Sequence, residues 1–269
     1  MDYQYFYAAI VAVVEGLTEF LPVSSTGHMI IVGNALGFEG AVVDVFEVFI
    51  QFGAILSVLF IYQERFLRFF TPRGWRLNAG FSAWHVAAGC VPCMGLAFFC
   101  YKYIKNLLFN PFTVAIGLAL GALLLFFGER YASKKQEQVN ELDKMTLRQA
   151  LYVGLFQILS LWPGFSRSGS TIAGGMLVGL SREVSASFTF IMAVPIMFAA
   201  SLFDLYKHYQ VLSSNDLGIL AWGFVIAAVV AYLSVKWFIS FVAKHNLSGF
   251  AWYRIALAIF TLWYFYVRS

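Results

Sequence analysis

The stretch Glu15-Gly-Leu-Thr-Glu-Phe-Leu-Pro-Val-Ser-Ser-Thr-Gly-His28 breaks an otherwise apolar helical segment. Pro22 ends the preceding helix, because proline lacks the N–H that the next helical hydrogen bond requires. The hydroxyl run Ser24–Thr26 favours the start of a second helix, since Ser and Thr are preferred N-caps. We therefore predict a helix over about residues 5–20, a break at 22–27 and a short helix over about 28–36.

The composition places most of the chain in lipid. Of the 269 residues, 61% are hydrophobic and 12% are charged, whereas soluble domains carry about 25% charged residues. The mean hydropathy is +0.76. Lipid-exposed backbone must satisfy its own hydrogen bonds, which favours helices of roughly 20 apolar residues. We predict an all-α integral membrane protein with full spans at about 41–62, 81–101, 111–128, 185–206, 217–241 and 249–267.

A second break resembles the first. Displaced by 142 residues, Ser24-Ser-Thr-Gly27 falls on Ser166-Arg-Ser-Gly169. A re-entrant hairpin enters and leaves on one side, and three spans then carry the chain across, so the second half begins on the opposite face. We predict one membrane domain of two inverted-topology repeats, each a re-entrant helical hairpin plus three transmembrane helices, whose breaks meet near the midplane. Repeat one covers about 1–128, a cytoplasmic loop about 129–146 and repeat two about 147–269. Within repeat two we predict a helix at about 147–162, a break at 163–169 and a short helix at about 170–180.

Lys and Arg residues are unequally shared between the two sides of this topology, twelve against four. Because cytoplasmic loops carry the excess, both termini are predicted to be periplasmic. No basic region precedes the first apolar segment, so no cleavable signal peptide is expected. The net charge of +4 lies in loops between helices, and no nucleic-acid partner is expected. The richer side holds Arg65, Arg68, Arg73, Arg76, Arg130, Lys134, Lys135, Lys144, Arg148, Arg182, Lys236 and Lys244; the other holds Lys102, Lys105, Lys207 and Arg268.

The first break is dense in ionisable and hydroxyl side chains. Charges inside membrane segments are costly, which makes each of them a candidate for function. Glu15 and Glu19 lie four residues apart and therefore on one helix face. Two carboxylates, the three consecutive hydroxyls of Ser24–Thr26 and the imidazole of His28 within fourteen residues suit acid–base or nucleophilic chemistry.

The second break, Trp162-Pro-Gly-Phe-Ser-Arg-Ser-Gly-Ser-Thr171, surrounds one guanidinium with glycines and hydroxyls. The N–H groups at the start of the following helix favour an anion, above all a phosphate, and arginine adds a bidentate fork. Facing one another, the two breaks would form a phosphoryl-transfer site. The predicted catalytic residues are Ser25, His28, Glu19, Glu15 and Arg167; the predicted phosphate-binding residues are Ser24, Thr26, Gly27, Ser166, Ser168, Gly169 and Thr171; Glu47 and Gln51, on one helix face, are predicted to support them.

These motifs, Glu15 to His28 and Pro163-Gly-Phe-Ser-Arg-Ser-Gly169, resemble those of the bacterial undecaprenyl-diphosphate phosphatase (bacitracin-resistance protein) family, and the likeness covers essentially the whole chain. The resemblance implies hydrolysis of undecaprenyl diphosphate to undecaprenyl phosphate and inorganic phosphate, which recycles the lipid carrier for peptidoglycan synthesis. It implies bacitracin resistance, since bacitracin competes for the substrate, and a site in the bacterial cytoplasmic (inner) membrane that opens to the periplasm. It also implies a divalent cation, Mg²⁺ or Ca²⁺, with Glu15 and Glu19 as candidate ligands.

Several alternatives stay open. The nucleophile is Ser25, His28 or a water that His28 activates, and Glu19 or His28 accepts its proton. A transporter or flippase for a phosphorylated lipid or another anion would suit the same inverted-repeat site. The three cysteines are expected to be packing residues, and Arg254, near a helix end, is expected to snorkel or to pair between helices. The oligomeric state is open, a homodimer included.

Overall fold

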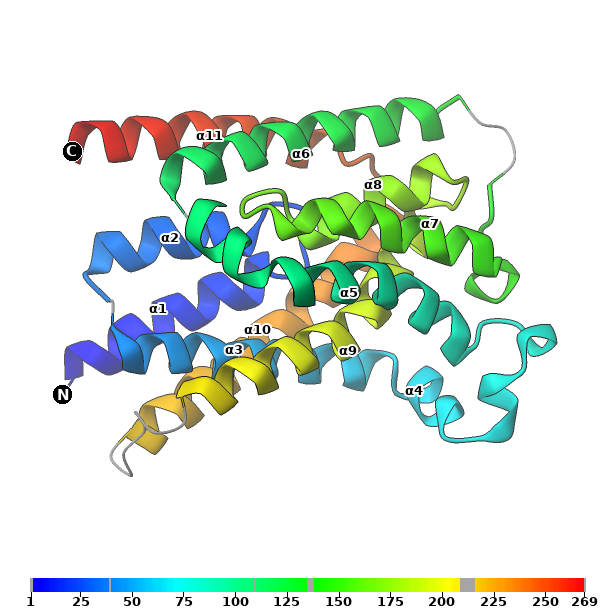
Figure 1. Cartoon of the computed structure of the whole chain (residues 1–269), viewed down its shortest axis with the longest axis horizontal. Helices are drawn as coiled ribbons and strands as arrows, with labels where there is room; N and C mark the ends of the chain where they lie inside the picture. Colours follow the sequence, from blue (N-terminus) through cyan, green and yellow to red (C-terminus); the bar gives the residue numbers. More distant parts are fainter. Residues whose placement is uncertain (1, 39, 109, 135–137, 209–215, 269) are drawn as a thin grey trace.

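The computed structural model describes residues 2–38, 40–108, 110–134, 138–208 and 216–268, which form a bundle of helices without β-strands (Figure 1). All-α architecture is therefore confirmed for this part of the chain. The α-helices are α1 Asp2–Thr18, α2 Ser25–Leu36, α3 Ala41–Ile61, α4 Gln63–Phe69, α5 Ala83–Leu108, α6 Pro111–Ala132, α7 Leu147–Gln157, α8 Arg167–Leu177, α9 Arg182–His208, α10 Leu217–Val242 and α11 Ser248–Arg268. The short 3₁₀ helices are η1 Pro72–Trp75, η2 Leu77–Ala79, η3 Leu142–Lys144 and η4 Ile158–Leu161.

Among the described residues, five helices are long and apolar enough to cross a membrane, namely α5, α6, α9, α10 and α11. The apolar part of α3 continues into α4 through a bend of 86°, and this pair makes a sixth candidate. The integral membrane class predicted from composition is confirmed. The sequence missed α4, η1 and η2, which lie in the stretch 63–80 between two predicted spans. An apolar pattern over so few residues does not distinguish a short helix from a polar loop.

The two halves share one order of elements: a helix, a break, a short helix and then three long helices. The breaks also share their local geometry. Ser24 and Ser166 both have φ of 70°, and the hydroxyl of each accepts a hydrogen bond from the backbone N–H three residues later. The inverted relation of the halves stays a prediction. In Figure 1, α1 begins at the end of the bundle where both termini lie, whereas α7 begins at the opposite end, which favours that relation.

The short helices of both hairpins begin earlier than predicted. We expected them at 28 and 170, but α2 begins at Ser25 and α8 begins at Arg167. The serine that precedes each helix caps it, so the helix starts directly after the cap. This correction matters because it places Ser25 and Arg167 at the first position of a helix, where the backbone amides have no partner within that helix.

Close helix contacts hold the hairpins inside the bundle. Helix α10 packs along α3 and α1, and α6 packs along α11 and α8. A Cβ on Gly53 of α3 would collide with the carbonyl oxygen of Phe224 in α10, and one on Gly117 of α6 would collide with that of Pro163 in the second break. Small residues therefore allow the backbones to approach one another, as is common between membrane helices.

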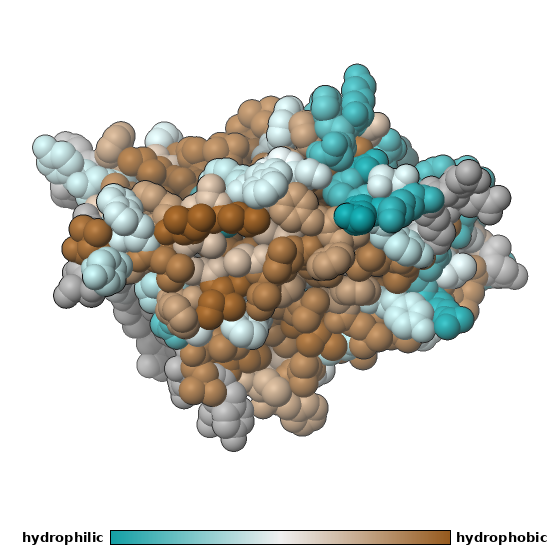
Figure 2. Space-filling model, turned by 90° about the horizontal axis from the view of Figure 1, so that it is seen from above, coloured by the Kyte–Doolittle hydropathy of each residue, from teal (hydrophilic) through white to brown (hydrophobic). Residues whose placement is uncertain are grey.

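One end of the bundle is polar. Figure 2 shows hydrophilic residues gathered at the end where α4 lies in Figure 1, and hydrophobic residues over most of the remaining face. At this end Asp143 accepts a hydrogen bond from Arg65 at 2.7 Å and from the Phe81 N–H at 3.0 Å. Glu129 of α6 forms a bidentate pair with Arg182. Lys135, counted among the cations of this side, lies outside the described residues.

Candidate functional site

The two breaks lie against one another in the interior of the bundle. Ser168 of α8 donates a hydrogen bond to the carbonyl oxygen of Leu21 at 2.7 Å. The Arg167 Nη2 donates to Glu19 Oε1 at 3.1 Å, and these side chains are only 13% and 10% exposed. Residues 148 positions apart thus form a largely buried ion pair. The acidic break and the guanidinium of the other break are brought together.

Strained caps direct the first residues of α2 and α8 toward this meeting point. A non-glycine residue at φ of 70° is costly, and it persists only where the surroundings impose it. The hydroxyl of Ser24 accepts from the Gly27 N–H at 3.4 Å, and that of Ser166 from the Gly169 N–H at 3.1 Å. The chain therefore turns sharply at each serine, and the next side chain, Ser25 or Arg167, points at Glu19.

Glu19 is the hub of the site. Its Oε2 accepts a hydrogen bond from Ser25 Oγ at 2.5 Å, while its Oε1 binds Arg167. The Arg167 guanidinium also lies 5.8 Å from the centre of the Phe20 ring. A carboxylate held in contact with a serine hydroxyl is the arrangement that a general base requires, because proton transfer needs hydrogen-bond distance.

Glu15 lies one helical turn before Glu19 and is 2% exposed. Its Oε1 has no hydrogen-bond partner among the described residues. The carboxylates of Glu19 and Glu47 repel it, and Arg167 attracts it. Glu47 of α3 is therefore near enough to act on the site electrostatically. Gln51, one turn further along α3, accepts a hydrogen bond from Ser201 at 3.4 Å, which ties it to α9.

Both ring nitrogens of His28 contact groups other than the Ser25 hydroxyl. Its Nδ1 lies 2.8 Å from the carbonyl oxygen of Ser24, and its Nε2 lies 2.7 Å from the Tyr253 hydroxyl. A carbonyl only accepts hydrogen bonds, so the proton of neutral His28 is on Nδ1 and Nε2 accepts from Tyr253. The two rings are stacked, with centroids 5.7 Å apart. Of the two predicted proton acceptors for Ser25, the geometry favours Glu19.

The predicted phosphate-binding hydroxyls mostly shape the breaks. Ser166 and Ser168 lie 3.2 Å apart, Oγ to Oγ. Thr171 donates to the carbonyl oxygen of Arg167 at 2.8 Å and accepts from Thr189 at 2.8 Å. The side chain of Thr26 is half-buried beside Ser25. The groups suited to an anion here are therefore the Arg167 guanidinium and the first amides of α2 and α8, rather than the serine hydroxyls.

Sequence reasoning missed two residues of α11 that touch the breaks. Tyr253 holds His28, as described above. Arg254 was expected to snorkel or to pair between helices. Snorkelling is wrong, because the side chain is fully buried, and Arg254 binds between helices by donating to backbone carbonyls of α6 and of both breaks. No motif marks either residue. The only available signal was that Arg254 is an arginine in an apolar helix, a residue type that is costly there and needs a partner.

The site offers carboxylates but no complete metal cage. Among the described residues, no group of three or more His, Cys, Asp or Glu side chains is arranged to hold an ion. Mg²⁺ is commonly held by one or two carboxylates together with substrate phosphates. The unpartnered Glu15 oxygen beside Glu19 fits that mode of binding, in which the ion is shared with a phosphorylated ligand.

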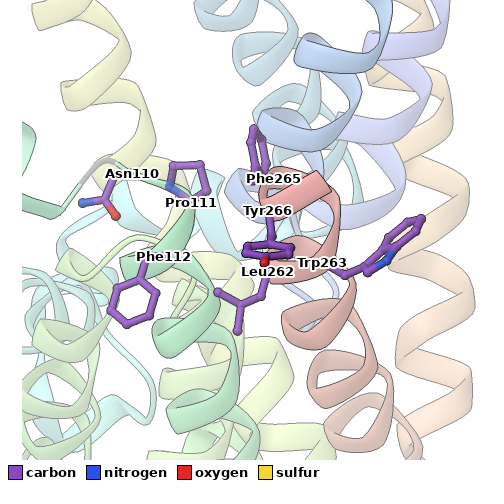
Figure 3. A pocket seen from close by; sticks show the side chains of 7 residues that line it. All are labelled: Asn110, Pro111, Phe112, Leu262, Trp263, Phe265 and Tyr266. Atoms are coloured by element: carbon purple, nitrogen blue, oxygen red, sulfur yellow. The ribbon is translucent and has the colours of Figure 1, made fainter. Parts of the chain in front are cut away.

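Two apolar cavities lie elsewhere. One of about 550 Å³ lies where α6 begins and α11 ends, and Figure 3 shows residues that line it, among them Phe112, Leu262 and Tyr266. Another of about 390 Å³ lies between α4, α5 and α9, beside Cys90. Neither is lined by Glu19 or Arg167, so neither is the polar site.

Comparisons with known proteins match nearly the whole chain. Residues 8–260 match the sequence profile of the family described as bacitracin resistance protein BacA. An undecaprenyl-diphosphatase of Solidesulfovibrio magneticus is 46% identical over 259 residues, which cover 95% of this chain and 97% of that protein. Undecaprenyl-diphosphatase 1 of Burkholderia ambifaria is 44% identical over 257 residues, covering 95% of this chain and 93% of the relative. Undecaprenyl-diphosphatase 1 of Bacillus thuringiensis is 44% identical over 254 residues, covering 94% and 95%.

Proposed function

Because this chain belongs to the bacitracin resistance protein BacA family, we propose that it hydrolyses undecaprenyl diphosphate to undecaprenyl phosphate and inorganic phosphate. The observation that carries the proposal is the contact of Glu19 with both Ser25 and Arg167. It joins a nucleophile, a base and a phosphate-binding cation in one largely buried site. The activity belongs to the recycling of the lipid carrier for peptidoglycan synthesis.

The proposed reaction uses the residues in the places where they lie. Arg167 and the first amides of α2 and α8 bind the distal phosphoryl group. Ser25 Oγ attacks the distal phosphorus while Glu19 Oε2 takes its proton, and the bond to the bridging oxygen breaks, releasing undecaprenyl phosphate. Glu19 passes this proton to the departing undecaprenyl phosphate. Water then attacks the phosphoserine while Glu19 takes a proton from it, the bond between Ser25 Oγ and phosphorus breaks, and Glu19 returns the proton to Ser25 Oγ as inorganic phosphate leaves. Placing Arg167 against the transferring group offsets the negative charge at the reaction centre.

The role of nucleophile is a proposal within this mechanism. His28, or a water that His28 activates, is the alternative, and it requires the imidazole to leave its contacts with Ser24 and Tyr253. Rapid quenching with a labelled distal phosphate decides between them. Label on Ser25 supports the mechanism above, whereas label on His28 makes His28 the nucleophile. If the quenched wild-type enzyme carries no covalent label, water attacks the phosphorus directly.

A divalent cation, Mg²⁺ or Ca²⁺, forms part of the proposal. Glu15 and Glu19 would hold it together with oxygens of the diphosphate. When bound, the ion neutralises phosphate charge, which favours attack by a nucleophile. The test is phosphate release by the purified protein after treatment with a chelator, followed by addition of each metal separately. Full activity in the chelated protein would remove the cation from the proposal.

The proposed location is the bacterial cytoplasmic (inner) membrane, with both termini and the opening of the site on the periplasmic side. The polar, cation-rich end of the bundle and the termini at the other end support this orientation. A reporter that is active only in the periplasm, fused to the C-terminus, tests it.

Bacitracin, as a competitor for the lipid diphosphate, should slow phosphate release in a way that excess substrate reverses. Light scattering of the purified protein tests for a homodimer.

The direct test of the activity is phosphate release from a long prenyl diphosphate by the purified protein in detergent. Arg167→Ala should abolish it, whereas Lys134→Ala, an exposed cation outside the site, should not alter it. Unchanged turnover in the Arg167 variant would refute the site. Tight binding of the lipid without phosphate release by the wild type would instead favour a transporter or flippase, which does not need Ser25 against Glu19.

A further inference from the structure

Arg254 of α11 joins three segments of the chain through one guanidinium. It donates to the carbonyl oxygen of Phe165 at 2.7 Å and to that of Gly164 at 3.1 Å, both in the second break. It donates to the carbonyl oxygen of Pro22, in the first break, at 3.5 Å. Its other acceptors, the carbonyl oxygens of Gly117 and Leu118 in α6, lie at 3.4 and 3.3 Å. A single side chain thus donates hydrogen bonds to backbone carbonyls in the irregular segments of both breaks.

This arginine has no counter-charge of its own. It is 0% exposed, and within the described ranges no carboxylate forms an ion pair with it. A buried charge is tolerated only where hydrogen bonds replace its hydration. Five carbonyl dipoles supply that replacement here, so the guanidinium and the bent backbone stabilise one another. Removing the side chain would leave the carbonyls of both breaks without a donor in a region remote from water.

The neighbouring chain leaves space for the guanidinium. A Cβ on Gly121 of α6 would collide with Arg254 Nη2, and one on Gly169 of α8 would lie 2.5 Å from Nη1. The guanidinium therefore lies in a fitted slot beside the start of α8. Such a slot leaves the side chain only a narrow range of positions, which is what a positioning role requires.

We propose that Arg254 is a positioning residue of the active site, which sets the separation of Glu19 and Arg167 by binding the backbone of both breaks. Pro22 lies three residues after Glu19, and Phe165 lies two residues before Arg167. A guanidinium bound to both carbonyls thus limits how far the two catalytic side chains can move apart. Lysine cannot replace it, because a single ammonium donates from one point and cannot reach carbonyls on several sides.

The test uses Arg254→Lys and Arg254→Gln, each of which keeps a donor group but loses the guanidinium that reaches carbonyls on several sides. The control is Arg182→Met, which removes a partly buried arginine whose partner, Glu129, lies away from the breaks. Two readouts are measured on each purified protein in detergent. The first is kcat and KM for phosphate release, and the second is hydrogen–deuterium exchange of the amides in residues 19–27 and 162–169.

Both test variants should lower kcat by ~100-fold, since a misplacement of about 1 Å costs that much, and should leave KM within about threefold. Both should speed amide exchange in the two breaks. Arg182→Met should lower the thermal midpoint but leave kcat and the exchange of the breaks unchanged. Unaltered break exchange in a folded test variant, or an equal loss of kcat in the control, overturns the proposal. If Arg254→Lys does not fold, Arg254→Gln decides by the same criteria.

The kinetic readout rests on the proposed function, whereas the exchange readout does not. Should the wild-type protein release no phosphate, the proposed function fails, and amide exchange alone then decides the role of Arg254. Faster exchange confined to the two breaks in Arg254→Lys supports it, and unchanged exchange refutes it.

Discussion

Substitution of Glu19 by glutamine tests the centre of the proposed chemistry, because it preserves the shape of the side chain and removes its charge. Glu19 uses both oxygens as acceptors, one toward Ser25 at 2.5 Å and one toward Arg167 at 3.1 Å. An amide can accept at only one of these places and presents an NH₂ group to the other donor. The variant therefore loses a base and also gains an unfavourable contact.

The magnitude follows from these two losses. A general base contributes about 10²–10⁴-fold to turnover, so kcat should fall by that factor, equivalent to about 3–5 kcal/mol of barrier at about 1.4 kcal/mol per tenfold change. The unsatisfied donor should lower the free energy of unfolding by about 1–3 kcal/mol. Turnover is thus affected more strongly than stability, which separates a catalytic role from a structural one.

The assay is the initial rate of phosphate release from a prenyl diphosphate in detergent, together with the thermal midpoint of each protein. The control is Glu141→Gln, the same chemical change at an exposed carboxylate that pairs with Lys144 outside the site. Glu141→Gln should keep the wild-type kcat. A kcat in Glu19→Gln that lies within about threefold of this control would refute the assignment of Glu19 as base.

Three further outcomes are expected. The hydrogen bond from Arg65 holds the pKa of Asp143 below its usual value, so its carboxylate stabilises the fold above about pH 4 and loses this effect as the pH falls through the lowered pKa. Asp143→Asn should therefore lower the thermal midpoint at neutral pH but not in acid. An equal deficit at both pH values would contradict this expectation. Tyr253→Phe removes the hydroxyl that binds His28 Nε2; because the proposed reaction uses Glu19 and not His28 as the base, kcat/KM should stay within about threefold of the wild type. Tyr264→Phe, which removes a contact of α11 with Asn34 of α2, should behave alike, and a larger loss confined to Tyr253→Phe would favour a role of His28 in the reaction. Glu129→Gln breaks the bidentate pair with Arg182 and alters the acceptor for the Leu247 N–H. The thermal midpoint should fall, because the free energy of unfolding decreases by up to about 3–5 kcal/mol, while the folded fraction of the protein keeps the wild-type kcat.

Much of the fold was predictable because lipid imposes a strong constraint. Long apolar segments had to be helices, and their order agrees with the structure; five of the six predicted spans qualify alone among the described residues, and the sixth only when α3 and α4 are counted together. The breaks were also predictable, because Pro22 and Pro163 cannot continue a helix and the serines that follow are caps. The boundaries were less accurate: α2 and α8 begin three residues before their expected starts, since capping, rather than the onset of apolar periodicity, decides where a helix begins.

The sequence predicted which residues are candidates for the chemistry, but not which of them contact one another. Glu19 and Arg167 stood out as charges in apolar surroundings. Whether Ser25 would meet Glu19 or His28 depended on the turn at Ser24, whose φ of 70° aims the next side chain at Glu19. His28 turned instead toward Tyr253, 225 positions away, and no local pattern records such a partner.

The amino-acid sequence by itself determined that the chain lies in a membrane, that two helices break beside hydroxyls and charges, and that the likeness of its motifs leads to one family. These are local properties, set by side-chain hydropathy and backbone sterics over a few turns. Only the tertiary structure decided which side of each break faces the other and that one arginine of the last helix binds both. Such contacts depend on how distant helices pack, because a buried guanidinium takes whichever carbonyls the surrounding backbone leaves without donors.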